Sequence, residues 1–219
     1  MLDALIDNDV ILKVCCYGIH GSLVAVMQEA KVEPAVLPLA RYVVSGRIKR
    51  NLPPAKRECA LSSLDRVLAV VGSVEADQAE IYLAASFEAT AQLQNLELDG
   101  GESLLLAILI RRGLKFLLTG DKRAIRAIEQ ISADVPDASI ACFEQFMKTV
   151  LLRIGASALR ELVCATPSVD LAMTSCFGCR SPVIDLDSPA EGLRSYVSDL
   201  RKEAARVLIP WDDLSSIVS

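Results

Sequence analysis

The sequence contains few aromatic residues and a single histidine. Phe, Trp and Tyr together account for 5% of the chain, so a core has to be built mainly from Leu, Val, Ile and Ala. The one histidine, His20, lies between Gly18 and Gly21, a setting more typical of a turn than of a catalytic site. Any enzymatic chemistry must therefore depend on other side chains.

Long apolar runs are also missing. No stretch approaches the roughly 18 uncharged apolar residues of a membrane span. The first residues have no basic segment followed by a long apolar one, which a signal peptide would have. We therefore expect a cytoplasmic protein with no membrane partner.

The cysteines are odd in number and scattered. There are seven, and in a chain without an export signal we expect them to be reduced thiols. Cys176-Phe-Gly-Cys179 is a single CxxC, to which Cys164 and Cys142 could be added as zinc ligands. No histidine is near them in sequence, so the pattern favours structural cysteines over a zinc site.

Composition and charge are those of a folded globule that is mildly acidic. Of 219 residues, 52% are hydrophobic and 23% are charged, and the net charge is −5. A nucleic-acid-binding protein is usually basic. The segment from Arg41 to Arg57 nevertheless holds six Arg and Lys residues and no acid. It is either a solvated surface or a contact for nucleic acid.

Short apolar runs alternate with helical patterns along the first 145 or so residues. We expect strands at 2–6, 68–72, 115–119 and 139–143, and helices at 10–17, 22–30, 55–68, 77–96, 102–112 and 122–131, with 35–44 ambiguous. Asn8 or Asp9 is expected to cap the first helix. Strands separated by helices predict a mainly parallel sheet covered on both faces, which is a three-layer α/β/α domain.

The last third of the sequence is mostly helical. We divide the chain into an α/β domain, 1–149, and a helical C-terminal extension, 150–219. Ser188-Pro-Ala-Glu191 predicts a capping box at a helix start, and Pro210 is expected to end that helix. Its apolar face is formed by Leu193, Val197, Leu200, Val207 and Leu208. We expect this face to pack on the α/β domain or on a second copy of the chain.

Three acidic residues occur where a parallel α/β protein binds ligands. Asp7 and Asp121 each follow a short apolar run, at the carboxyl end of an expected strand. Glu102 opens the helix before the second of these strands and shares a face with its leucines. Clustered carboxylates repel each other, and Mg²⁺ or Mn²⁺ relieves that repulsion. Such a site can hydrolyse a phosphodiester without a histidine.

The same residues carry a resemblance to a known family. Leu5-Ile-Asp7-Asn-Asp9 resembles the opening motif of PIN-domain nucleases, Gly101-Glu102 resembles their helix start, and Thr119-Gly-Asp121 resembles their final Thr-x-Asp motif. The resemblance covers roughly residues 1–145. It implies a PIN-like fold and metal-dependent RNA cleavage, as in the toxins of bacterial toxin–antitoxin pairs, which often dimerise and bind an antitoxin protein.

By this resemblance Asp7, Glu102 and Asp121 would be catalytic and would hold Mg²⁺ or Mn²⁺, with Asp9 assisting. The candidate RNA contacts are Arg47, Lys49, Arg50, Lys122 and Arg123. The family usually supplies one more acid from the middle of the domain, and the candidates for it are Glu58, Glu75 and Glu80. The chain is also much longer than a minimal toxin.

Two other interpretations stay open. Asp7-Asn-Asp9 also resembles the opening of haloacid-dehalogenase-type phosphatases, with a nucleophile at Asp7 and an acid at Asp9, although residues 122–125 lack the acid that usually follows Gly120-Asp121. Taken singly, each of these acidic residues also suits a structural role, because helix N-caps and the first turns of helices favour acidic side chains. The chain would then be a catalytically degenerate PIN-like interaction module.

Overall fold

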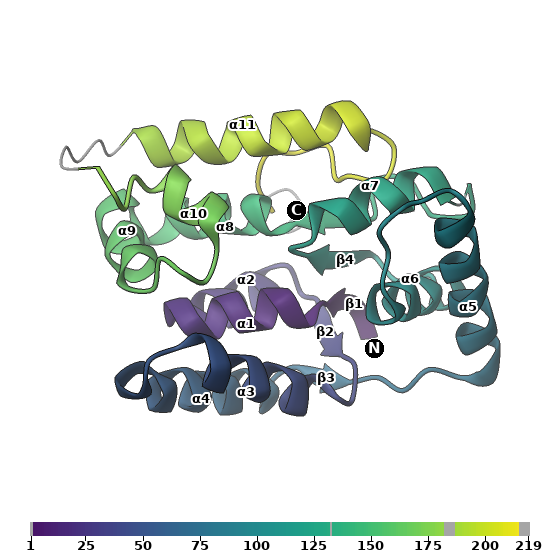
Figure 1. Cartoon of the computed structure of the whole chain (residues 1–219), viewed down its shortest axis with the longest axis horizontal. Coiled ribbons are helices and arrows are strands. Elements are labelled where there is room, and N and C mark those ends of the chain that lie inside the picture. The colour runs from purple at the N-terminus through teal and green to yellow at the C-terminus, as the bar shows by residue number, and fades with distance from the viewer. Residues whose placement is uncertain (1, 132, 182–186, 215–219) are drawn as a thin grey trace.

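A computed structural model describes residues 2–131, 133–181 and 187–214. The strands in these ranges are β1 (Leu2–Ile6), β2 (Glu33–Val36), β3 (Gly72–Ser73), β4 (Phe116–Thr119) and β5 (Ile140–Cys142). They form one sheet in the order β3-β2-β1-β4-β5, and every neighbouring pair is parallel (Figure 1). The central strands β1 and β4 are the two that carry the predicted acidic motifs.

Helices connect the strands and make up most of the C-terminal part. They are α1 (Asn8–Tyr17), α2 (His20–Glu29), α3 (Ala40–Asn51), α4 (Pro54–Leu68), α5 (Gln78–Leu93), α6 (Gly100–Arg112), α7 (Lys122–Ile131), α8 (Phe143–Ile154), α9 (Ala156–Ala165), α10 (Leu171–Cys176) and α11 (Ser188–Glu203). Gly113 ends α6 in the left-handed conformation that glycine favours, with φ of 60°.

Helices cover both faces of the sheet because alternate strand residues point in opposite directions. Ala4 and Ile6 of β1 belong to one apolar cluster, which includes α1 to α4 and α8 to α10. Leu5, between them, belongs to a second cluster with α5, α6, α7 and part of α11. The expected three-layer α/β/α class with a parallel sheet is therefore confirmed.

Several element boundaries differ from the sequence-based expectations. The first helix begins at Asn8 and not after it, and Asp7 occupies the N-cap position without a side-chain cap hydrogen bond. Asn8 and Asp9 are not the cap because they are the first two residues inside the helix. Residues 68–72 are mostly the end of α4 and a turn, so β3 is shorter and later than predicted.

The capping box predicted at Ser188 is wrong. The N-cap of α11 is Asp187, whose backbone is helical (φ −87°, ψ −30°) and which makes no side-chain cap hydrogen bond. Such a cap normally needs an extended backbone. The helix also ends at Glu203, well before Pro210, so Val207 and Leu208 lie in the segment after it.

The C-terminal segment packs on the chain's own sheet. All five residues of the predicted apolar face are buried. The Ile140 backbone N–H donates to the Val207 carbonyl at 2.8 Å, and the Ile209 N–H donates to the Ile140 carbonyl at 2.8 Å, so this segment runs along β5. The described residues of this segment therefore pack against β5 and the apolar cluster on that face of the sheet. The domain boundary after residue 149 falls inside α8 and stays a prediction.

A disulfide corrects the expectation that all cysteines are reduced. Cys164, on α9, is bonded to Cys179, which follows α10. The pairing also uses two of the four sulfurs considered for zinc, and Cys176 is buried as a free thiol. In the described ranges, no helix has the length and apolar character needed to cross a membrane.

Candidate functional site

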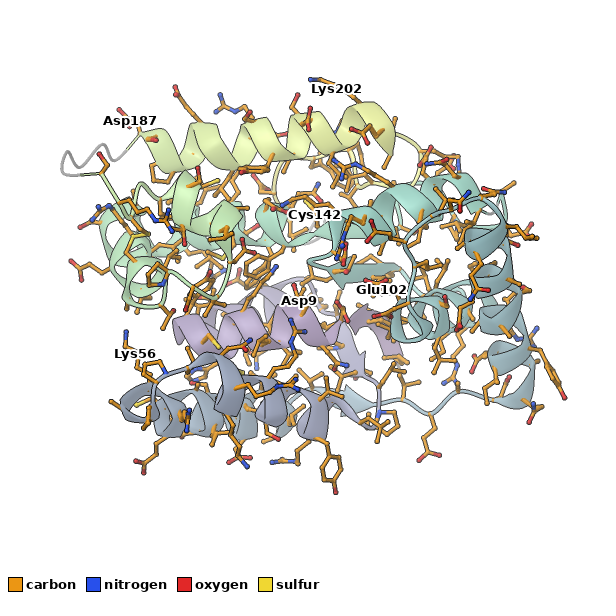
Figure 2. All side chains as sticks on the ribbon, viewed as in Figure 1. Asp9, Lys56, Glu102, Cys142, Asp187 and Lys202 are labelled. Atoms are coloured by element: carbon orange, nitrogen blue, oxygen red, sulfur yellow. A yellow bond between two sulfur atoms is a disulfide. The ribbon has the colours of Figure 1, made fainter. Side chains whose placement is uncertain are left out.

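A cleft of about 900 Å³ opens at the carboxyl ends of β1 and β4. Its six acidic side chains are Asp7, Asp9, Asp99, Glu102, Asp121 and Asp170. Its five basic side chains are Lys13, Arg47, Lys122, Arg123 and Arg126. Asp9 and Glu102 lie near the middle of Figure 2, on α1 and α6. The sequence-predicted acids Asp7, Asp9, Glu102 and Asp121 therefore line one cleft.

Asp7 is the most buried of these carboxylates, with 9% of the residue exposed. Its backbone N–H donates to the Leu118 carbonyl at 2.9 Å, which continues the pairing of β1 with β4. The Thr119 hydroxyl donates to Asp7 Oδ2 at 3.3 Å. Burial, helped by the nearby charges of Asp9 and Asp99, raises the pKa of Asp7 to about 6.

Glu102 occupies the N3 position of α6. It forms a reciprocal capping box with Asp99, in which Asp99 N–H donates to Glu102 Oε2 at 3.0 Å and Glu102 N–H donates to Asp99 Oδ1 at 2.9 Å. Burial raises the pKa of Glu102 to about 8, and the charges of Asp99, Asp121 and Asp7 add to the effect. These carboxylates are thus close enough to repel one another.

Asp121 starts the turn into α7. Its N–H donates to the Thr119 hydroxyl oxygen at 3.2 Å, so Thr119 links Asp121 to Asp7. Asp121 Oδ1 accepts from the Arg123 N–H at 2.8 Å, and its Oδ2 is 3.2 Å from the Arg123 guanidinium. Burial alone would raise the pKa of Asp121, but these hydrogen bonds outweigh it and hold the pKa below its ordinary value.

Asp9 is held by two cations. Lys13 Nζ lies 2.6 Å from Asp9 Oδ2, and Arg47 Nη2 lies 2.9 Å from Asp9 Oδ1. Lys13 also lies 2.7 Å from Asp170, the N-cap residue of α10. Burial lowers the pKa of Lys13, but Asp9 and Asp170 together outweigh it and raise that pKa above its ordinary value.

Gly120 lets the backbone lie directly against this ion pair. A Cβ at position 120 would stand 2.5 Å from Asp9 Oδ2 and 2.9 Å from Lys13 Nζ. No larger residue fits there unless both side chains move. The glycine of Thr119-Gly-Asp121 is therefore required by close approach and not by backbone conformation.

The donors suit a hard cation in kind, because carboxylate oxygens are what Mg²⁺ and Mn²⁺ prefer. The present positions of these carboxylates, however, do not form a cation site. Among the described residues, no three or more His, Cys, Asp or Glu side chains stand together as a metal-binding group. Glu102 is turned toward the Asp99 N–H, Asp121 toward Arg123, and Asp9 toward Lys13 and Arg47. A cation would have to draw Glu102 and Asp121 away from these partners.

None of the three candidates for the additional acid lines the cleft. Glu58 and Glu75 are exposed. Glu80 is buried and forms hydrogen bonds with the Arg112 guanidinium at 2.7 and 2.8 Å, which ties α5 to α6. The additional acids of the cleft are Asp99 and Asp170. Asp99 could have been found from its place three residues before Glu102, the spacing of a capping box.

The five predicted RNA contacts separate into two groups. Lys49 and Arg50 are exposed on α3. Arg47, Lys122 and Arg123 line the cleft and have acidic partners: Arg47 pairs with Asp9, Lys122 Nζ lies 2.5 Å from Glu144, and Arg123 lies 2.6 Å from Glu97.

Comparisons with protein-family models, with curated proteins and with solved structures find no match to this chain, so the chemistry of the cleft has to be argued from its own residues.

Proposed function

We propose that this chain is a PIN-like, metal-dependent nuclease that hydrolyses phosphodiester bonds in RNA. Asp7, Glu102 and Asp121 would hold Mg²⁺ or Mn²⁺. The observation that carries the proposal is the convergence of Asp7, Glu102 and Asp121 on one cleft at the carboxyl ends of β1 and β4. Burial and the neighbouring carboxylates raise the pKa of Asp7 to about 6. A divalent cation would relieve that repulsion.

The bound cation would supply Lewis acidity and an acidified water. The chain's own residues would do the rest. Thr119, through its hydrogen bonds to Asp7 and Asp121, fixes these two residues relative to each other. The five basic side chains of the cleft nearly balance its six acidic ones, so a phosphate can approach without meeting a wholly negative surface.

The test is cleavage of a fluorescent single-stranded RNA in Mg²⁺ or Mn²⁺, with chelator as the blank. Asp7→Asn should abolish cleavage while leaving the protein folded. Asp199→Asn is the matched control, because it removes one charge from an exposed position on α11. Equal cleavage by both variants would contradict the proposal. Hydrolysis of a phosphomonoester without RNA cleavage would favour the dehalogenase-type chemistry instead.

Asp9 argues against that phosphatase chemistry. The mechanism needs Asp9 as a proton donor, but both oxygens of this carboxylate are in ion pairs with Lys13 and Arg47. The same ion pairs favour a second candidate function, the non-catalytic interaction module, because Lys13 already supplies a cation to the cleft. Calorimetric titration with Mn²⁺ separates the two: binding that is lost in Asp7→Asn supports the nuclease, and no binding supports the module. An antitoxin partner and self-association stay predictions that follow from the nuclease proposal.

A further inference from the structure

Helix α3 presents an exposed face with an aromatic ring and two cations. Tyr42 is 74% exposed, and Leu39, just before the helix, is 64% exposed. Lys49 and Arg50, seven and eight positions after Tyr42, share its face because they lie two turns further along. The opposite face, with Ala40, Val44 and Ile48, is buried. In Figure 1 this helix lies beside α4 at the lower edge of the molecule.

Gly46 lies on the same face, one turn after Tyr42 and one turn before Lys49 and Arg50. A glycine inside a helix lowers its stability relative to alanine. Nothing in the fold demands it here, since a Cβ at this position would meet no atom within 4 Å and its φ is not positive. A glycine at this position leaves room for something outside the chain to approach the helix backbone closely.

The flank of α3 reaches the cleft. Val43, next to Tyr42, lines the cleft with 39% of its surface exposed. Arg47 extends from the same flank to Asp9 at 2.9 Å. A ligand lying over the exposed face of α3 would therefore continue directly into the predicted catalytic cleft.

We propose that this face of α3 binds single-stranded nucleic acid, with one base stacked on Tyr42, the chain passing over Gly46, and phosphates contacting Lys49 and Arg50. Of the six cations between Arg41 and Arg57, Arg41 and Arg47 are paired with Asp65 and Asp9, so the positive charge of this face comes from Lys49 and Arg50. Two cations beside an exposed aromatic ring suit the phosphates and bases of a single strand. Stacking on an exposed aromatic ring requires an unpaired base, which a duplex does not offer. The inference rests on the proposed function in one respect, namely that the bound strand continues from α3 into the cleft.

The experiment measures binding without cleavage. Fluorescence anisotropy of a labelled 12-nucleotide single-stranded RNA is recorded in excess chelator for the full chain. Tyr42→Ala should weaken binding about tenfold, as loss of one stacked base does, and Tyr42→Trp should restore it. Tyr82→Ala is the matched control, because Tyr82 is 69% exposed on α5 and does not line the cleft. Gly46→Ala should raise the melting temperature and weaken binding.

Charge is tested separately. The Lys49→Gln/Arg50→Gln double variant should flatten the dependence of binding on salt concentration, because two phosphate contacts are lost. Three results would each overturn the proposal. The first is equal binding by Tyr42→Ala and Tyr82→Ala, and the second is equal binding of a duplex of the same length. The third is absence of RNA binding, with a protein captured by this face instead.

Failure here and failure of the nuclease proposal are distinguishable. A chain that cleaves RNA, and binds it equally well with and without the Tyr42 ring, keeps the nuclease and loses this surface. A chain that binds RNA through Tyr42 but never cleaves it, in any divalent cation, keeps this surface and loses the nuclease.

Discussion

The Lys13 ammonium lies 2.7 Å from the Asp170 carboxylate, although the two residues are far apart in the sequence. Asp170 is fixed at the N-cap of α10, where it accepts from the Ala172 and Met173 N–H groups at 2.8 and 3.1 Å. Through this ion pair, the start of α10 forms one wall of the cleft that begins at β1. A minimal α/β domain without α10 would leave Lys13 with Asp9 as its one acidic partner.

Removal of Lys13 should destabilise the fold strongly. Lys13→Met leaves Asp9 and Asp170 near each other without their shared cation, in a place where the Lys13 and Asp170 side chains are 9% and 10% exposed. We expect a loss of about 3–5 kcal/mol in the free energy of unfolding, measured by urea denaturation. Lys202→Met is the control, since its pair with Asp199 is exposed, and should cost less than about 1 kcal/mol. A cost for Lys13→Met no larger than the control would show that the buried pair is not stabilising.

Asp7 should make stability fall as the pH rises. Its pKa is raised in the folded state from 3.8 to about 6, so the folded protein holds this proton more tightly than the unfolded chain does. The resulting destabilisation is absent below pH 4, grows through the window from about 4 to 6, and is complete above it. Without divalent cations, Asp7→Asn should therefore be more stable than the wild type by on the order of 2–3 kcal/mol at pH 8.

Urea denaturation in chelator at pH 4 and pH 8 checks this. The difference between Asp7→Asn and wild type should nearly vanish at pH 4, and Asp199→Asn should show no comparable pH-dependent gain. If Asp7→Asn is the less stable protein at pH 8, the carboxylate is better accommodated than its raised pKa indicates.

The disulfide should stabilise the part of the chain that carries Asp170. Cys164 and Cys179 are 15 positions apart and enclose α10 and its N-cap. Replacing both with serine should lower the free energy of unfolding by about 3 kcal/mol, and dithiothreitol should bring the wild type to the level of the variant. Cys59→Ser, at an exposed free thiol, is the control and should change little. A wild type that dithiothreitol leaves unchanged would mean that the bond does not form in solution.

Several strands of the sheet and the acidic residues at their ends could be predicted, because short stretches of sequence indicate them. Phe116–Thr119 is a short apolar run between Gly113 and Gly120, which predicts a buried strand. The capping-box spacing of Asp99 and Glu102 is an equally local signal, although the prediction named Glu102 alone. Asp7 and Asp121 follow strands, so a parallel sheet places them at the same edge.

The rest could not be predicted because it depends on contacts between distant segments. Nothing around Asp170 in the sequence indicates that it would meet Lys13, and Arg47 meets Asp9 only because α3 packs against α1. β2 contains Pro34 and β3 has two residues, so neither has the alternation by which strands are recognised. The distant Arg47 and the local Lys13 together engage both oxygens of Asp9, the residue to which the resemblance gives an assisting role at the metal.

Gly120 gives the sharpest test of how closely the β4–α7 turn is fitted to the cleft. Gly120→Ala places a methyl group 2.5 Å from Asp9 Oδ2, so the Asp9–Lys13 pair or the turn has to move. We expect a destabilisation of about 1–3 kcal/mol by urea denaturation, together with reduced RNA cleavage if the nuclease proposal holds. Gly21→Ala is the matched control, because a Cβ there meets no atom within 4 Å and the residue lies inside α2. That control should be neutral or more stable by about 0.5–1 kcal/mol, as alanine is in a helix. Equal stability of the two variants would mean that Asp9 and Lys13 rearrange without cost, and Gly120 would then have no special place in the cleft.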